Sequence, residues 1–235
     1  MDVAEVAREV EASLRSLGGP ERAMQEKRYL KSDLVHLGVP VPAIRKVALA
    51  AVRSRVERAE VLALAERLWT ASSDGVPVHE LRMAAVEVLV KRAPSLEPED
   101  LALAERFLRE SSSWVYVDAL ADRVVGDMVL RRPQTAATLD AWVHDPVLWI
   151  RRSALLALLR GIRAGRPDLA RISRYGDVLL GEREFFIRKA LGWVLRELSK
   201  RDPDWVAAWV DERAERLSGV TLREATRHLP RPAAR

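Results

Sequence analysis

The sequence predicts an all-α fold, an α-solenoid in which pairs of helices repeat along the chain. Two observations predict it. Apolar residues recur at helical spacing along almost the whole chain, and no stretch shows the strict alternation of a half-buried strand. A short motif also returns at intervals of 33 to 37 residues, which suits a repeat of two helices. We therefore expect residues 1–235 to form a single repeat domain.

Short breaks rich in Gly, Pro, Ser or Asp divide the chain into roughly a dozen helices of about 10 to 18 residues. Many of these breaks place a capping side chain or a proline where the next helix begins. No break is long or polar enough to be a linker between domains. The breaks, in order, are residues 18–20, 40–42, 72–75, 94–98, 111–113, 145–146, 165–167, 201–203 and 218–219.

The repeat is visible as segments that align with one another. Residues 81–85, 150–154 and 187–191 align without gaps, and each continues as a helix. Residues 222–225 form a fourth copy and residues 117–121 a more divergent fifth. A period near 35 residues that holds two helices is typical of a HEAT-like solenoid. Chance matches in an Ala- and Leu-rich helical chain are the alternative, and five registered copies argue against it.

Composition narrows the function classes. Lys and Arg number 39 against 34 Asp and Glu, a net charge of +5 that permits a polyanionic partner such as nucleic acid. Without cysteine, the chain has no disulfide, thiolate metal site or Cys nucleophile. No signal peptide or membrane span is evident, so we expect a cytoplasmic protein. We expect no metal or cofactor, because no metal-binding spacing relates the four histidines, which are His36, His79, His144 and His228.

Equivalent residues of a solenoid form rows on its concave surface. An Arg-rich row suits a negatively charged rod such as duplex DNA, because cationic side chains neutralise phosphates. The alternative is that these arginines sit at helix starts and cap carbonyls. One row is Arg82, Asp118, Arg151, Arg188 and Arg223, and the row beside it is Met83, Ala119, Arg152, Lys189 and Glu224.

Two tryptophans lie beside this row. Trp114 precedes Asp118 by four residues and Trp193 follows Lys189 by four, so each pair shares one helix face. Each also has a simpler interpretation, since either Trp can be a core anchor and Asp118 a surface charge paired with a row arginine. The remaining tryptophans are expected to be packing residues, namely Trp69, Trp142, Trp205 and Trp209.

Five motifs, in this order along the chain, carry a family resemblance. They are Lys27-Arg28-Tyr29-Leu30-Lys31 with Leu37-Gly38-Val39, then Trp114-x-x-Val117-Asp118, then Trp149-Ile150-x-Arg152-x-Ala154, then the block from Glu184 to Glu197, and finally Arg223-Glu224-Ala225. With them the chain resembles the AlkD-like DNA glycosylases of the DNA alkylation repair family. The resemblance implies a HEAT-like solenoid that excises alkylated purines.

The resemblance also implies residue roles. Asp118 takes the place of the family's catalytic aspartate. Trp114 and Trp193 take the places of the aromatic residues that pack against the deoxyribose of the target nucleotide. Arg152 matches the arginine that supports the backbone of the active site, and Tyr29 an N-terminal aromatic that reaches the same site. The residues expected to bind the DNA substrate are Tyr29, Lys31, Arg82, Arg151, Arg188, Lys189 and Arg223.

The chemistry agrees with these roles. Cleavage of an N-glycosidic bond passes through an oxocarbenium-like sugar, which a carboxylate stabilises while it orients the attacking water. A cationic alkylpurine leaves readily, so no strong general acid is required. We expect a monomeric, monofunctional glycosylase acting on 3-methyladenine, 7-methylguanine or bulkier N3 and N7 adducts in duplex DNA. The alternative is a non-catalytic HEAT-like scaffold that binds DNA or protein.

Overall fold

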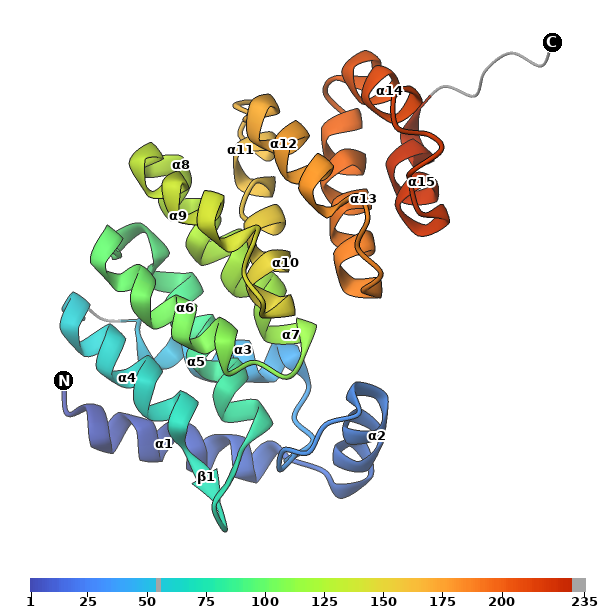
Figure 1. Ribbon diagram of the computed structural model, residues 1–235. Helices are drawn as coiled ribbons and strands as arrows, with labels where there is room; N and C mark the ends of the chain where they lie inside the picture. Colours follow the sequence, from blue (N-terminus) through green and yellow to red (C-terminus); the bar gives the residue numbers. More distant parts are fainter. Residues whose placement is uncertain (54–55, 230–235) are drawn as a thin grey trace. The chain divides into compact units, whose positions relative to one another are not determined.

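The computed structural model describes residues 1–53 and 56–229 and is mostly helical with little sheet, which confirms the predicted all-α class (Figure 1). The chain divides into two compact units, Met1–Leu120 and Ala121–Arg235. The expectation of one continuous domain over residues 1–235 stays a prediction. Within the described residues, no helix combines the length and the apolar character that a membrane span requires.

Unit 1 is organised around one buried helix. Its elements are α1 (Val3–Leu17), α2 (Pro20–Leu30), α3 (Val41–Ala51), α4 (Arg58–Thr70), β1 (Ser72–Ser73), β2 (Val76–Pro77), α5 (His79–Arg92), the 3₁₀ turns η1 (Ala93–Ser95) and η2 (Pro98–Asp100), α6 (Leu101–Arg109) and α7 (Trp114–Ala119). Helix α5 packs against α3, α4 and α7 and is buried on nearly all sides, as expected for the central helix of a helical layer. Helix α2, in contrast, has no fully buried residue.

Unit 2 has a comparable centre. The π-helical turn η3 (Leu120–Val125) leads into α8 (Gly126–Arg131), η4 (Pro133–Thr135), α9 (Ala136–Trp142), α10 (Leu148–Leu156), α11 (Leu159–Arg163), α12 (Leu169–Leu179), α13 (Phe185–Ser199), α14 (Pro203–Asp211), α15 (Gly219–Ala225) and η5 (Thr226–His228). Helix α13 contacts α10, α12, α14 and α15. The contact with α15 is close, because a Cβ placed on Gly192 would lie 2.6 Å from Cβ of Glu224.

Two boundaries differ from those expected. The break predicted at residues 72–75 contains a β-hairpin in which Ser73 pairs with Val76, and the turn residues Asp74 and Gly75 both have positive φ. An Asp-Gly pair with this geometry is the preferred two-residue hairpin turn. No break was expected between residues 113 and 145, yet α8 ends at Arg131 and a 3₁₀ turn begins at Pro133.

Candidate functional site

Trp114 and Asp118 lie on one face of α7. The helix follows Ser113, whose backbone is extended (φ −147°, ψ 144°) and whose C=O can therefore start the helical hydrogen bonds. Tyr116 and Val117 face the core and are fully buried, whereas Trp114 and Asp118 are only half-buried. The shared face predicted from their spacing is confirmed, and it presents an indole and a carboxylate together at the surface of unit 1.

The backbone changes its hydrogen-bond pattern directly after Asp118. Residues Leu120–Val125 form a π-helical turn before the α-helical pattern resumes at Gly126. Turns of this kind are rare and occur frequently at functional sites. Neither composition nor spacing in this part of the sequence signals the π-helix, so sequence analysis missed it.

The repeat register is confirmed by the places of the row residues. They occur on five different helices, each at the fourth or fifth position from the start. The residues and their helices are Arg82 on α5, Asp118 on α7, Arg151 on α10, Arg188 on α13 and Arg223 on α15. The segments aligned by sequence are therefore equivalent in secondary structure.

Arg82 does not have the exposed position expected for a DNA contact. It is only 9% exposed, and its guanidinium carbon lies 4.6 Å from the centre of the Trp69 ring. Its Nη1 donates to the carbonyl of Glu110 at 3.2 Å, and its Nε to the carbonyl of Trp69 at 3.4 Å. Burial lowers the pKa of Arg82 from its usual value. Arg82 therefore joins α4, α5 and the residue that follows α6, and its burial gives no support to the predicted contact with DNA.

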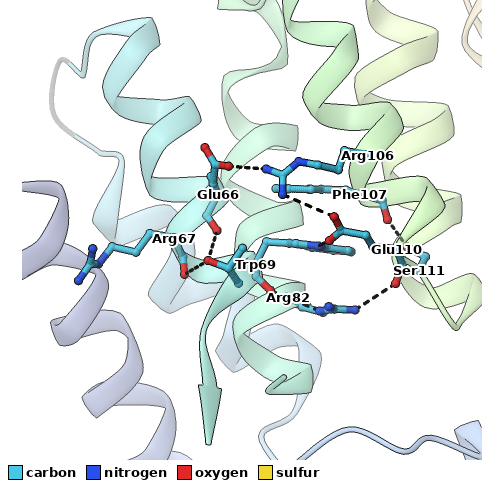
Figure 2. Close-up of polar contacts among 9 residues, drawn as sticks. Glu66, Arg67, Trp69, Arg82, Arg106, Phe107, Glu110 and Ser111 are labelled. Carbon is cyan, nitrogen blue, oxygen red and sulfur yellow. Dashed lines mark hydrogen bonds and ion pairs between the residues drawn. The ribbon is translucent and has the colours of Figure 1, made fainter. Parts of the chain in front are cut away.

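The ring of Trp69 lies between two flat groups in this cluster (Figure 2). Phe107 stacks on it with ring centres 4.2 Å apart and planes within 6°, on the side opposite Arg82. The Nε1 of Trp69 donates to a carboxylate oxygen of Glu110 at 2.6 Å. Trp69 is completely buried, so the prediction that it is a packing residue is confirmed.

Arg151 and Arg188 make the same backbone contact in two repeats. Arg151 donates from Nη1 to the carbonyl of Asp145 at 2.7 Å, and Arg188 from Nε to the carbonyl of Glu182 at 2.7 Å. In each case the acceptor lies six residues earlier, in the turn before the helix. Arg151 also lies 2.8 Å from a carboxylate oxygen of Glu182. The carbonyl-capping interpretation therefore describes both arginines, and their contact with DNA stays a prediction.

Arg152 and Lys189 are also held by neighbouring groups. Arg152 is 3% exposed, and its Nη1 donates to the carbonyl of Phe186 at 2.5 Å. This burial suits an arginine that supports backbone geometry. Lys189 donates from Nζ to a carboxylate oxygen of Glu224 at 2.5 Å. These contacts cross-link α10 to α13 and α13 to α15.

Four predicted residues present surface for a ligand. Tyr29 is 74% exposed on α2, and Lys31 is exposed just after that helix, where its φ of 50° marks the left-handed helix end. Arg223 is exposed on α15, and Trp193 is half-buried on α13. The space freed at Gly192, beside Trp193, is filled by α15, since a Cβ there would also lie 3.1 Å from the carbonyl of Thr221.

The predicted catalytic set is divided between the two units. Trp114 and Asp118 belong to unit 1, and Arg152 and Trp193 to unit 2. Their convergence on one nucleotide stays a prediction. Within unit 1 alone, α7 places a half-buried indole and a half-buried carboxylate on one face, and these two groups suit glycosidic chemistry.

Comparison with known proteins identifies the family. The model of a protein family described as "DNA alkylation repair enzyme" matches residues 10–229 of the chain. The chain belongs to this family. Membership assigns it to the repair of alkylated DNA, and the predicted resemblance is confirmed. None of the curated protein sequences matches the chain.

Three solved structures share the fold of this chain. A predicted DNA alkylation repair enzyme from Enterococcus faecalis superposes with a TM-score of 0.81 at 22% identity, covering 92% of this chain and 98% of the other. AlkD2 from Streptococcus mutans has a TM-score of 0.59 at 20% identity, covering 88% of this chain and 99% of its own. The structure of smu.31 from Streptococcus mutans has a TM-score of 0.61 at 19% identity, covering 93% of this chain and 100% of its own.

Proposed function

We propose that this alkylation repair enzyme is a monofunctional DNA glycosylase that releases cationic alkylated purines from duplex DNA. Its substrates would be 3-methyladenine and 7-methylguanine, with bulky N3 or N7 adducts as a further class. Family membership supports alkylated DNA as the substrate. We further propose that the enzyme acts as a monomer on cytoplasmic DNA and needs no metal for this reaction.

One observation carries the proposal: Trp114 and Asp118 face outward together from α7. As the glycosidic bond breaks, positive charge develops on the deoxyribose. A carboxylate beside the sugar stabilises that charge and can orient water toward C1′. An indole face adds cation–π attraction of about 0.5–2 kcal/mol. Helix geometry places the two groups on the same face of α7.

The leaving group explains why a single carboxylate suffices. An alkylated N3 or N7 makes the purine a cation, and the departing base becomes neutral without being protonated by the protein. Asp118 then stabilises the sugar and orients the attacking water, and no general acid is needed. We assign Arg152 a positioning role, because its buried guanidinium holds the carbonyl of Phe186.

Base release from methylated duplex DNA tests the proposal. The parent chain and Asp118→Asn are incubated with the DNA, and the freed purines are separated by chromatography. Asp211→Asn is the matched control, because it removes one exposed carboxylate at the end of α14. We expect the parent and Asp211→Asn to release 3- or 7-methylpurine and Asp118→Asn to release none while still binding DNA.

Equal release by Asp118→Asn and the parent would contradict the mechanism. A scaffold that binds DNA without catalysis is distinguished by the same assay, since it binds methylated and bulky-adduct DNA and releases no base from either. DNA affinity measured over a range of salt concentrations reports the phosphate contacts, because each released counterion steepens the salt dependence.

A further inference from the structure

Three side chains that could ligate a metal ion meet in unit 1, apart from the α7 pair. They are Glu26 on α2, His36 in the segment between α2 and α3, and His79 at the first position of α5. One ligand atom from each lies within 4.8 Å of the other two. Within residues 1–53 and 56–229 this is the one group of His, Asp and Glu side chains with that arrangement. None of the roles predicted for DNA repair uses these residues.

Several polar atoms of the cluster are buried without a hydrogen-bond partner. They are Oε2 of Glu26 and both ring nitrogens, Nδ1 and Nε2, of His36. The other carboxylate oxygen of Glu26 accepts from Nη2 of Arg22 at 2.8 Å, so one oxygen is satisfied and its neighbour is not. Burial of such atoms costs free energy unless a partner satisfies them, and a bound ion is one of the usual partners.

The backbone holds His36 against His79. Val35 forms a single parallel bridge to Val78, in which the amide of His79 donates to the carbonyl of Val35 at 2.8 Å. The two imidazole rings consequently stack, with centres 4.4 Å apart and planes within 11°.

The next residue on α5 fixes the other side of His36. The buried carboxylate of Glu80 accepts from the amides of Leu37 at 2.9 Å and of Gly38 at 2.6 Å. The segment that carries His36 is thus tied to α5 before and after the histidine. The backbone on both sides of His36 is therefore fixed, and only side chains need to adjust when the site binds an ion.

His79 has the second contact that metal-binding histidines usually have. Its Nδ1 lies 2.5 Å from the hydroxyl oxygen of Tyr116, which is buried in the core of unit 1. With its proton on Nδ1 and Tyr116 as acceptor, His79 offers the lone pair of Nε2 to a metal.

We propose that Glu26, His36 and His79 bind one divalent transition-metal ion, with Zn²⁺ the best match. Two imidazoles and one carboxylate are a common Zn²⁺ donor set, which leaves the fourth position for water. Zn²⁺ bonds of about 2.0–2.1 Å bring ligand atoms to roughly 3.3 Å from one another, so the cluster must contract. Glu26 and His36 are half-buried, and rotation of their side chains would supply this movement.

The metal would have a structural consequence. Helix α2 buries no residue completely, yet it carries the exposed Tyr29. An ion bound by Glu26, His36 and His79 joins α2 to the central helix α5. The site therefore stabilises the part of unit 1 that presents Tyr29, independently of whether the enzyme is a glycosylase.

Metal titration of the full chain tests the site. After treatment with a chelator and its removal, the protein is titrated with Zn²⁺ by calorimetry and with Co²⁺ by visible absorption. We expect one equivalent to bind, with the stronger absorption of low-coordinate Co²⁺. His36→Gln and Glu26→Gln should lose this equivalent, and His144→Gln, which changes an exposed histidine in unit 2, should keep it. Circular dichroism verifies that each variant is folded.

Two further measurements separate ligation from structural damage. Tyr116→Phe keeps all three ligands and should weaken Zn²⁺ binding about 10- to 100-fold at unchanged stoichiometry. Zn²⁺ should raise the thermal unfolding midpoint of the parent and leave that of folded His36→Gln unchanged, since a ligand stabilises only the state that binds it. The proposal is overturned if the parent binds no Zn²⁺ or if His36→Gln and Glu26→Gln both retain the equivalent. These readouts contain no DNA, so their failure is distinct from failure of the glycosylase proposal.

Discussion

Replacement of Gly192 by alanine tests the packing of α13 against α15. The added Cβ would lie 2.6 Å from Cβ of Glu224, 3.3 Å from its Cγ and 3.1 Å from the carbonyl of Thr221. Carbon atoms in contact are normally about 3.5–4.0 Å apart, so α15 must move by roughly 1 Å. Glu224 cannot turn aside freely, because Lys189 and Arg196 both pair with its carboxylate.

Two opposing effects set the magnitude. Overpacking of a tight contact costs about 1–3 kcal/mol, whereas replacement of glycine within a helix by alanine gains about 1 kcal/mol. We expect a net loss of about 1 kcal/mol in the free energy of unfolding. Gly181→Ala is the control, because a Cβ there meets nothing within 4 Å, and it should leave stability within about 0.5 kcal/mol of the parent.

Urea unfolding followed by far-UV circular dichroism measures the difference. With an m-value of about 1–3 kcal/mol/M, a loss of 1 kcal/mol lowers the midpoint by roughly 0.3–1 M. If Gly192→Ala unfolds at the parent's midpoint or above it with an unchanged m-value, then α15 does not pack against α13 as described.

Three further predictions concern charged residues. Arg82→Gln should lower the stability of unit 1 by about 1–3 kcal/mol, because the carbonyls of Trp69 and Glu110 lose a buried donor. It should not change the salt dependence of DNA binding measured by fluorescence anisotropy. A smaller salt slope would instead show that Arg82 contacts DNA. Arg223→Gln should lower the salt slope of DNA binding by about 1 and leave the urea midpoint unchanged. An unaltered salt slope would show that Arg223 does not contact DNA. Hydrogen bonds from Arg171 hold the pKa of Asp140 below its usual range. The ionised Asp140 therefore stabilises unit 2, by about 1 kcal/mol at this part-exposed site. This stabilisation is present above pH 4 and disappears as the pH falls through the folded-state pKa. Asp140→Asn should therefore lower the urea midpoint more at pH 7 than at pH 2, and an equal loss at both pH values would argue against a charge effect.

The features that sequence analysis predicted correctly depend on residues close together in the chain. Helical periodicity predicts the all-α class, and the pairing of Trp114 with Asp118 on one face follows from 3.6 residues per turn. The repeat register follows from recurrence of a local pattern, so Arg151 and Arg188 occupy equivalent helix positions. The Asp-Gly pair at residues 74–75 is itself a local signal for a hairpin turn. The hairpin was not predicted because its two-residue strands are too short to show an alternating pattern.

Tertiary structure decided which side chains are buried and which distant residues meet. An arginine at a row position has the same local sequence whether its guanidinium faces solvent or another helix, so burial of Arg82 against Trp69 depended on the packing of α4, α5 and α6. His36 and His79 lack a metal-binding spacing because they come from different elements, joined by the bridge between Val35 and Val78. Helical periodicity is determined by the local chain, whereas these contacts form only when its elements pack together.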